Sequence, residues 1–119
     1  MSISEAIEDA ILAIIRPPRS IYDLDEMPQI IPIKDYGNIT RHPVEFLNCR
    51  KQKIIGSYYQ PNEELPEKSC VIYLHGNASC QIDGTYIIPA FVPAGIGVFC
   101  LDTSGSGLSE GEFVSLGFL

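Results

Sequence analysis

Two short, continuously apolar runs constrain this sequence more than any other feature. Residues 71–74 (VIYL) and 97–101 (GVFCL) combine β-branched and aromatic residues without polar alternation, which predicts strands buried on both faces of a sheet. The stretch between them, 83–92, has apolar residues at helical spacing, and its prolines predict a short or bent helix. A strand, a helix and a strand in this order predict a βαβ unit with parallel strands.

Each predicted strand is followed by a polar loop that contains glycine. Residues 75–79 (HGNAS) follow the first strand, and residues 102–111 (DTSGSGLSEG) follow the second. Because the carboxyl ends of parallel strands meet at one edge of a sheet, both loops are expected to open on the same side. Glycine lets such a turn expose a backbone N–H group, and such groups can stabilise a developing oxyanion.

The residues upstream predict a helix, an arm and a hairpin. Isoleucines at positions 3, 7, 11, 14 and 15 recur at helical spacing, and Pro17-Pro18 ends this amphipathic helix. We expect the helix to pack on its own domain, since its acidic polar face is wrong for a membrane anchor. Residues 19–32 are punctuated by prolines and predict an irregular arm. Runs at 44–48 and 53–59 around a polar turn predict an antiparallel hairpin.

The order of these elements resembles the N-terminal portion of an α/β-hydrolase. The pattern Asp102-x-x-Gly105-x-Gly107-x-Ser109-x-Gly111 resembles the loop after the fourth strand in the serine aminopeptidase-like and acyl-protein thioesterase-like branches. The resemblance covers roughly residues 40–119 and implies an α/β fold, an antiparallel hairpin followed by a parallel βαβ unit. It divides the chain into residues 1–39, the amphipathic helix and proline-rich arm, and residues 40–119, a partial α/β-hydrolase domain.

The resemblance also implies roles for residues of the two loops. An oxyanion would be held by the backbone N–H of Asn77, with Ala78 as the neighbouring candidate. The residues that would shape the loops and the pocket wall beside them are His75, Gly76, Asp102, Gly105, Gly107 and Ser109. Asp102 is expected to accept hydrogen bonds from the loop amides that follow it.

Residues 107–111 (GLSEG) match the G-x-S-x-G pattern of a nucleophile elbow. An elbow lies directly between a strand and a helix, whereas residues 103–107 (TSGSG) cannot form a buried strand. The two histidines, His42 and His75, both precede Ser109, although the family places its base after the nucleophile. We therefore expect Ser109 to be structural, and the catalytic serine, acid and histidine to lie beyond Leu119.

These features imply a truncated serine hydrolase that in its complete form acts on ester, thioester or peptide-type acyl bonds and is inactive as this chain. The substrate would be a small-molecule or peptide acyl compound, and no cofactor is implied. One alternative is a non-catalytic α/β-hydrolase-like remnant that binds a ligand or partner, and another is an enzyme that uses Ser109. Residues 71–74 would form an open apolar edge, so a partner or a C-terminal half is expected to complete the sheet.

Composition and charge exclude several other functions. A net charge of −7 argues against a nucleic-acid partner and against anionic membranes. The four cysteines lack C-x-x-C spacing, no metal cluster is evident, and reduced thiols are expected. The acidic N-terminus lacks a secretory signal, and the apolar run 10–15 is too short to span a membrane, which predicts a cytoplasmic protein.

Overall fold

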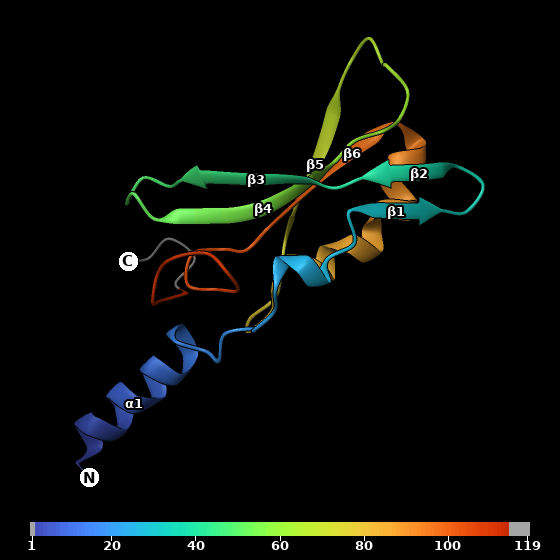
Figure 1. The fold of residues 1–119 in the computed structure, drawn as a ribbon. Coiled ribbons are helices and arrows are strands. Elements are labelled where there is room, and N and C mark those ends of the chain that lie inside the picture. Colours follow the sequence, from blue (N-terminus) through green and yellow to red (C-terminus); the bar gives the residue numbers. More distant parts are fainter. Residues whose placement is uncertain (1, 115–119) are drawn as a thin grey trace.

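The computed structural model describes residues 2–114, which form a mixed α/β fold with two sheets (Figure 1). The helical elements in chain order are α1 (Ile3–Ile15), η1 (Leu24–Glu26), η2 (Gln81–Ile87), α2 (Ile88–Phe91) and η3 (Val92–Ala94), where η denotes a 3₁₀-helix. The strands are β1 (Ile30–Ile33), β2 (Gly37–Thr40), β3 (His42–Leu47), β4 (Lys53–Tyr59), β5 (Ser69–Leu74) and β6 (Ile96–Leu101).

The larger sheet has four strands in the order β3-β4-β6-β5. Strands β5 and β6 are parallel, with Val71 opposite Val98 and Leu74 opposite Leu101. The other neighbours are antiparallel, including the hairpin of β3 and β4. The predicted hairpin and the predicted parallel unit are therefore both confirmed.

The connection between β5 and β6 is helical but not one regular helix. Elements η2, α2 and η3 follow one another, because Pro89 and Pro93 have no backbone N–H with which to continue an α-helix. Gly95, at a φ of 85°, ends the run in the left-handed conformation. The expectation of a short or bent helix is confirmed.

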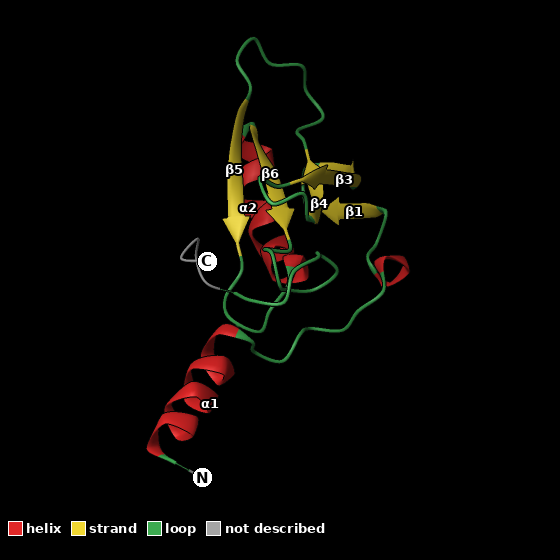
Figure 2. Ribbon diagram, turned by 90° about the vertical axis from the view of Figure 1, so that its left-hand side faces the viewer, coloured by secondary structure: helices red, strands yellow, loops and turns green. Residues whose placement is uncertain are grey.

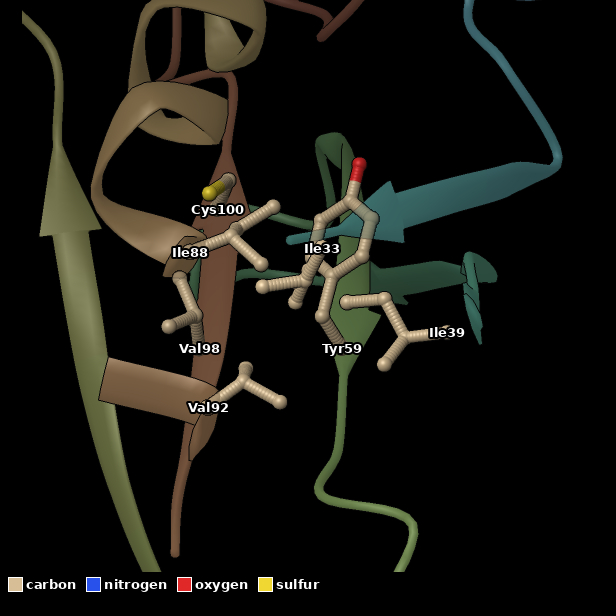
Figure 3. Packing of buried hydrophobic residues seen from close by; sticks show 7 residues of the cluster. All are labelled: Ile33, Ile39, Tyr59, Ile88, Val92, Val98 and Cys100. Carbon is tan, nitrogen blue, oxygen red and sulfur yellow. The ribbon is translucent and has the colours of Figure 1, made fainter. Parts of the chain in front are cut away.

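The core lies between this helical connection and one face of the sheet (Figure 3). Ile88 and Val92 of the connection pack with Val98 and Cys100 of β6, and all four side chains are fully buried. Tyr59 of β4 completes the contact from the sheet. Val98 and Cys100 are two positions apart on β6, and side chains of a strand alternate between its faces, so both lie on the covered face.

The prediction that residues 19–32 form only an irregular arm is wrong. Strand β1 begins within that stretch, at Ile30, and pairs with β2 in a second hairpin, with Ile31 opposite Ile39. Pro32 is compatible with this pairing because a two-stranded sheet has only edge strands. Ile33 and Ile39 are buried in the main core. Their burial stabilises a strand that the prolines in the sequence argued against.

Helix α1 forms as predicted but does not pack on the domain. It begins with a capping box, in which Ser2 Oγ accepts the Glu5 N–H and the Glu5 carboxylate accepts the Ser2 N–H. None of its residues is buried, and it projects away from both sheets (Figures 1 and 2). Contacts at its end hold it instead: Val114 N–H donates to Ile15 O at 2.6 Å, and Arg16 pairs with Glu112 at 3.8 Å.

The other face of the larger sheet carries exposed apolar side chains. Ile72 and Leu74 of β5 are 61% and 65% exposed, and Phe46 of β3 is 41% exposed. No strand among residues 2–114 pairs with the outer edge of β5. Within the same residues, no helix combines the length and apolar character needed to cross a bilayer.

Candidate functional site

The loops after β5 and β6 meet at the carboxyl end of the parallel strands, as predicted. Their direct link is His75, whose Nε2 accepts the backbone N–H of Thr103 at 3.0 Å and lies 3.2 Å from Thr103 Oγ1. In Figure 2 the arrowheads of β5 and β6 both point toward these loops. The βαβ topology thus brings residues 28 positions apart into contact.

The hydrogen bonds of His75 fix its tautomer. A backbone N–H can only donate, so Nε2 must be the unprotonated nitrogen. Nδ1 therefore carries the proton and donates it to Gly76 O at 2.7 Å. With both ring nitrogens engaged, the neutral imidazole ties the two loops together and holds the start of the first loop in place.

The first loop turns tightly and presents two free amides. Ser79 N–H donates to Gly76 O at 3.2 Å, and Ala78 at the corner has a φ of 58°. Asn77 and Ala78 are exposed, and their amides have no acceptor within residues 2–114. A positive φ is strained for alanine and is often found where backbone geometry serves a site. Both amides are therefore free of protein acceptors within residues 2–114, and Asn77, unlike Ala78, lines the pocket described below.

Gly76 is not the residue whose backbone conformation forms this turn. Its φ is not positive, and a Cβ added to it would meet nothing within 4 Å. The left-handed position belongs to Ala78 instead. Backbone freedom at Gly76 is therefore not what shapes this turn.

Asp102 organises the loop after β6, residues 102–111, from a fully buried position. This segment is called the glycine loop below. Its Oδ2 accepts the Leu108 N–H at 2.8 Å and the Tyr22 hydroxyl, and its Oδ1 accepts the Gln81 N–H at 2.7 Å. The expected bond to a following loop amide is confirmed. Tyr22 and Gln81 were not predicted from the sequence, since neither lies in a recognisable motif.

Close packing of the loop explains two of its glycines. A Cβ on Gly107, which has a φ of 51°, would lie 2.3 Å from Asp102 Oδ2. Gly105 has a φ of 83°, and a Cβ there would lie 2.5 Å from Phe113 O. Both positions require glycine for conformation and for space.

Ser109 is buried, and its hydroxyl is fully engaged. Oγ donates to Asp102 O at 2.6 Å and accepts the Ile55 N–H at 2.9 Å. The only hydroxyl proton therefore points to a backbone carbonyl, and His75 is bonded to Thr103 instead. These contacts join the loop to β4, which is a structural role.

Arg19 holds the same loop from the N-terminal arm. Its Nη1 donates to Gly107 O at 3.0 Å and Ser109 O at 2.5 Å, and its Nη2 donates to Gly111 O at 2.5 Å. A planar guanidinium suits several carbonyls at once, because its donors are fixed in a fork. Nothing in the sequence predicts this contact beyond a basic residue after two prolines.

A buried polar network runs from the loop into the core. Gln81 Nε2 donates to the Tyr22 hydroxyl at 2.8 Å, and Ser57 Oγ donates to Gln81 Oε1 at 2.7 Å. Arg41 Nη1 lies 3.4 Å from Ser57 Oγ, while Arg41 Nε has no partner among the described residues. Burial, together with the bond to Asp102, raises the pKa of Tyr22 well above its ordinary value, which keeps the phenol protonated.

A pocket of about 570 Å³ opens beside the two loops. Its lining comes from the end of α1, the β3–β4 turn and both loops: Ile14, residues 48–50, Gln52, residues 74–77, Thr103, Ser104, Phe113 and Val114. The volume falls in the range of small-molecule sites. Within residues 2–114, no three metal-ligating side chains gather as a metal site would require.

Comparison with protein-family models, curated proteins and solved structures finds no match to this chain. The inference about function therefore depends on the two loops, the pocket and the motifs. Of the residues singled out in the sequence, His75, Gly76 and Asn77 line the pocket directly. Asp102 and Ser109 lie behind it and support its wall.

Proposed function

We propose that residues 40–114 are part of a serine hydrolase of the α/β-hydrolase type that acts on ester, thioester or peptide-type acyl bonds. Their contribution would be half of the oxyanion hole and one wall of the acyl pocket. The serine aminopeptidase-like and acyl-protein thioesterase-like branches fit the glycine loop best. The catalytic serine, acid and histidine would come from polypeptide other than these 119 residues.

The observation that carries this proposal is the pair of exposed amides at Asn77 and Ala78. They lie at the carboxyl end of a parallel strand, where α/β sheets bind their ligands. The loop that carries these amides is held in place, since His75 is hydrogen-bonded to both loops. Donors that are held in place before the reaction stabilise an oxyanion without reorganisation.

Ser109 and His75 do not form a catalytic pair. The Ser109 hydroxyl donates to a backbone carbonyl, and His75 Nε2 accepts a backbone amide. We therefore expect the 119-residue chain alone to be inactive toward acyl substrates. The same observation favours a second candidate function, a non-catalytic module that binds an acyl ligand or a partner through the same loops.

The transcript sequence beyond codon 119 tests the proposal. A serine hydrolase requires a further strand, a G-x-S-x-G turn and a helix, followed by an acid and a histidine. A fluorophosphonate probe should label the serine of that turn in the longer protein and leave residues 1–119 unlabelled. A reading frame without such a turn would overturn the hydrolase proposal and favour the binding module. Labelling of residues 1–119 that Ser109→Ala abolishes would instead place the nucleophile in this chain.

The oxyanion role of the backbone has its own test in the longer protein. Asn77→Pro removes the N–H group, whereas Asn77→Ala keeps it. Loss of one such donor lowers kcat by about 10²–10³, so Asn77→Pro should lose that factor while Asn77→Ala stays near wild type. Equal activities of the two variants, with matching circular dichroism spectra, would exclude the Asn77 amide as the donor.

A further inference from the structure

We propose that the 119-residue chain forms a two-fold symmetric dimer in which helix α1 of each copy covers the apolar face of the larger sheet of the other copy. Two exposed apolar surfaces of the same chain carry this proposal, one on the sheet and one on the helix. The dimer leaves the outer edge of β5 open, so the proposal does not depend on the proposed function.

The uncovered face of the larger sheet is apolar across all four strands. The strand registers and the alternation of side chains decide which residues share it. They are His42, Val44 and Phe46 on β3, Ile54, Gly56 and Tyr58 on β4, Gly97, Phe99 and Leu101 on β6, and Cys70, Ile72 and Leu74 on β5. None of them is Asp, Glu, Lys or Arg. Parallel strands occur almost only where both faces of their sheet are covered, so this face requires a cover.

Helix α1 carries an apolar stripe that is equally exposed. Four isoleucines recur at spacings of three and four residues, which places them on one side of the helix: Ile3, Ile7, Ile11 and Ile14. They are 50–81% exposed, and no residue of α1 is buried. Because helices in proteins gain most of their stability by packing an apolar side against another surface, α1 also requires a partner surface.

The sheet of the same copy cannot be that partner while the end of α1 keeps its contacts. Ile15 O accepts the Val114 N–H at 2.6 Å, and the Arg16 guanidinium lies 5.2 Å from the centre of the Phe113 ring. These contacts hold the last turn so that the helix extends away from its own sheet (Figures 1 and 2). The stripe is therefore presented to a second molecule.

The surface area of the chain is sufficient for this pairing. The chain exposes 7819 Å², about 1,400 Å² more than the roughly 6,400 Å² of a compact monomer of 13.1 kDa. Its radius of gyration is 17.1 Å, whereas a compact domain of 119 residues has about 13.5 Å. A standard interface buries about 800 Å² on each partner. The excess surface of one copy is thus larger than a stable dimer needs to bury.

A two-fold axis beside Ile14 and Leu74, which line the same pocket, brings the two surfaces into register. Since α1 extends from the carboxyl end of β5 in its own copy, this axis lays it along β5 of the other copy. The 13 residues of α1 rise about 20 Å, and the 6 residues of β5 span about 20 Å. Ile7 lies about 10 Å along the helix from Ile14, and Cys70 lies about 13 Å along the strand from Leu74. Ile7 of one copy is therefore near Cys70 of the other.

Sedimentation equilibrium of the 119-residue chain tests the role of the stripe. We expect a dimer, and Ile11→Gln should raise its Kd about tenfold or more, because the substitution acts twice in a symmetric pair. Leu12→Gln is the matched control and should leave the Kd unchanged. Leu12 is the next residue of the same helix and is 39% exposed, but it lies on the side opposite the stripe.

Glutamine is a good helix former, so circular dichroism should show the same helix content in both variants. A wild-type chain that stays monomeric up to its solubility limit would overturn the proposal. Equal effects of Ile11→Gln and Leu12→Gln on the Kd would do the same.

Chemical crosslinking tests the arrangement of the two copies. Of the four cysteines, Cys49 and Cys70 are exposed, so Cys49→Ser leaves Cys70 as the accessible thiol. In that background, Ile7→Cys should give a covalent dimer with a short bis-maleimide reagent, and adding Cys70→Ser should abolish it. Asp9→Cys is the matched control, because position 9 lies on the other side of α1, and it should give no covalent dimer.

Two crosslinking results would contradict the exchange of helices between copies. A crosslink within one chain, identified by mass spectrometry from Ile7→Cys to Cys70, would show that α1 covers the sheet of its own copy. Covalent dimers that form equally well from Ile7→Cys and Asp9→Cys would show that the stripe does not face the other sheet.

Discussion

The Tyr22 hydroxyl donates to the Asp102 carboxylate in the interior, 80 residues away along the chain. Tyr22 comes from the N-terminal arm and Asp102 from the end of β6, so this bond fastens the arm to the loop beside the pocket. The same carboxylate holds Leu108 in the glycine loop and Gln81 at the start of η2. One buried side chain therefore joins three segments that line or support the site.

Tyr22→Phe should lower the free energy of unfolding by about 1–3 kcal/mol, because the Asp102 carboxylate and Gln81 Nε2 both lose a buried partner. Urea denaturation measures the change. Tyr36→Phe is the control, since that hydroxyl donates to Glu63 and accepts the Asn62 N–H in exposed positions, where water can replace it, and its loss should change stability by less than about 1 kcal/mol. Equal effects of the two substitutions would show that the Asp102 network is not a stabilising centre.

Gly107→Ala and Gly76→Ala should differ sharply, although both glycines belong to the motif loops. The added methyl group at position 107 would lie 2.3 Å from Asp102 Oδ2 at a positive φ, whereas position 76 is open. Strain of this kind costs about 1–3 kcal/mol, and the steric clash adds to it. Thermal melting should show a large loss of Tm for Gly107→Ala and almost none for Gly76→Ala. A tolerated Gly107→Ala would contradict the packing of Asp102 against the loop.

How much of this site the sequence predicts depends on whether the contacts are local. The strand ends, the two loops and the bond from Asp102 to the following loop follow from apolar runs and turn residues, which act over a few positions. The bond from Arg19 to Gly107 spans 88 residues and the bond from Tyr22 to Asp102 spans 80, and no local pattern in the sequence predicts either. Strand β1 was not predicted for a related reason. Burial of Ile33 against residues distant in the sequence outweighs the local effect of Pro32.

Arg19→Ala should loosen the glycine loop more than the fold as a whole. Three loop carbonyls lose their donor, so the amides of residues 103–111 are expected to exchange hydrogen faster, while those of the β5–β6 ladder keep their protection. Hydrogen-exchange mass spectrometry resolves the two regions. Arg16→Ala serves as the comparison, since the side chain of Arg16 forms an exposed ion pair at 3.8 Å and a contact with the Phe113 ring, and bonds no carbonyl of the glycine loop. Unchanged exchange in Arg19→Ala would show that the contacts of Asp102 and Ser109 hold the loop without Arg19.

Stability should fall in alkaline solution because of buried phenol and thiol groups. Burial raises the pKa of Tyr59 from 10.0 to about 12 and that of Cys100 from 9.0 to about 12. As pH rises, these groups ionise first in the unfolded chain, so their contribution to the free energy of unfolding is fully present below about pH 9 and is lost toward pH 12. Tyr59→Phe should flatten this decline. It should change stability little at pH 7, because the Tyr59 hydroxyl has no partner within residues 2–114. An equally steep decline in the variant would assign the effect to other groups.

The open edge of β5 should make the 119-residue chain associate with itself. No strand within residues 2–114 pairs with the N–H and C=O groups of that edge, and Ile72 and Leu74 add exposed apolar surface on the uncovered face. Ile72→Lys should therefore raise the concentration at which the chain begins to self-associate in sedimentation-velocity runs, since a charge on an edge strand disfavours pairing. Ile21→Lys is the matched control: Ile21 is 95% exposed, but it lies outside the sheet. If the wild-type chain sediments as a monomer with a sharp cooperative melt, the sheet needs no further strand, and the proposal that other polypeptide completes it would be wrong.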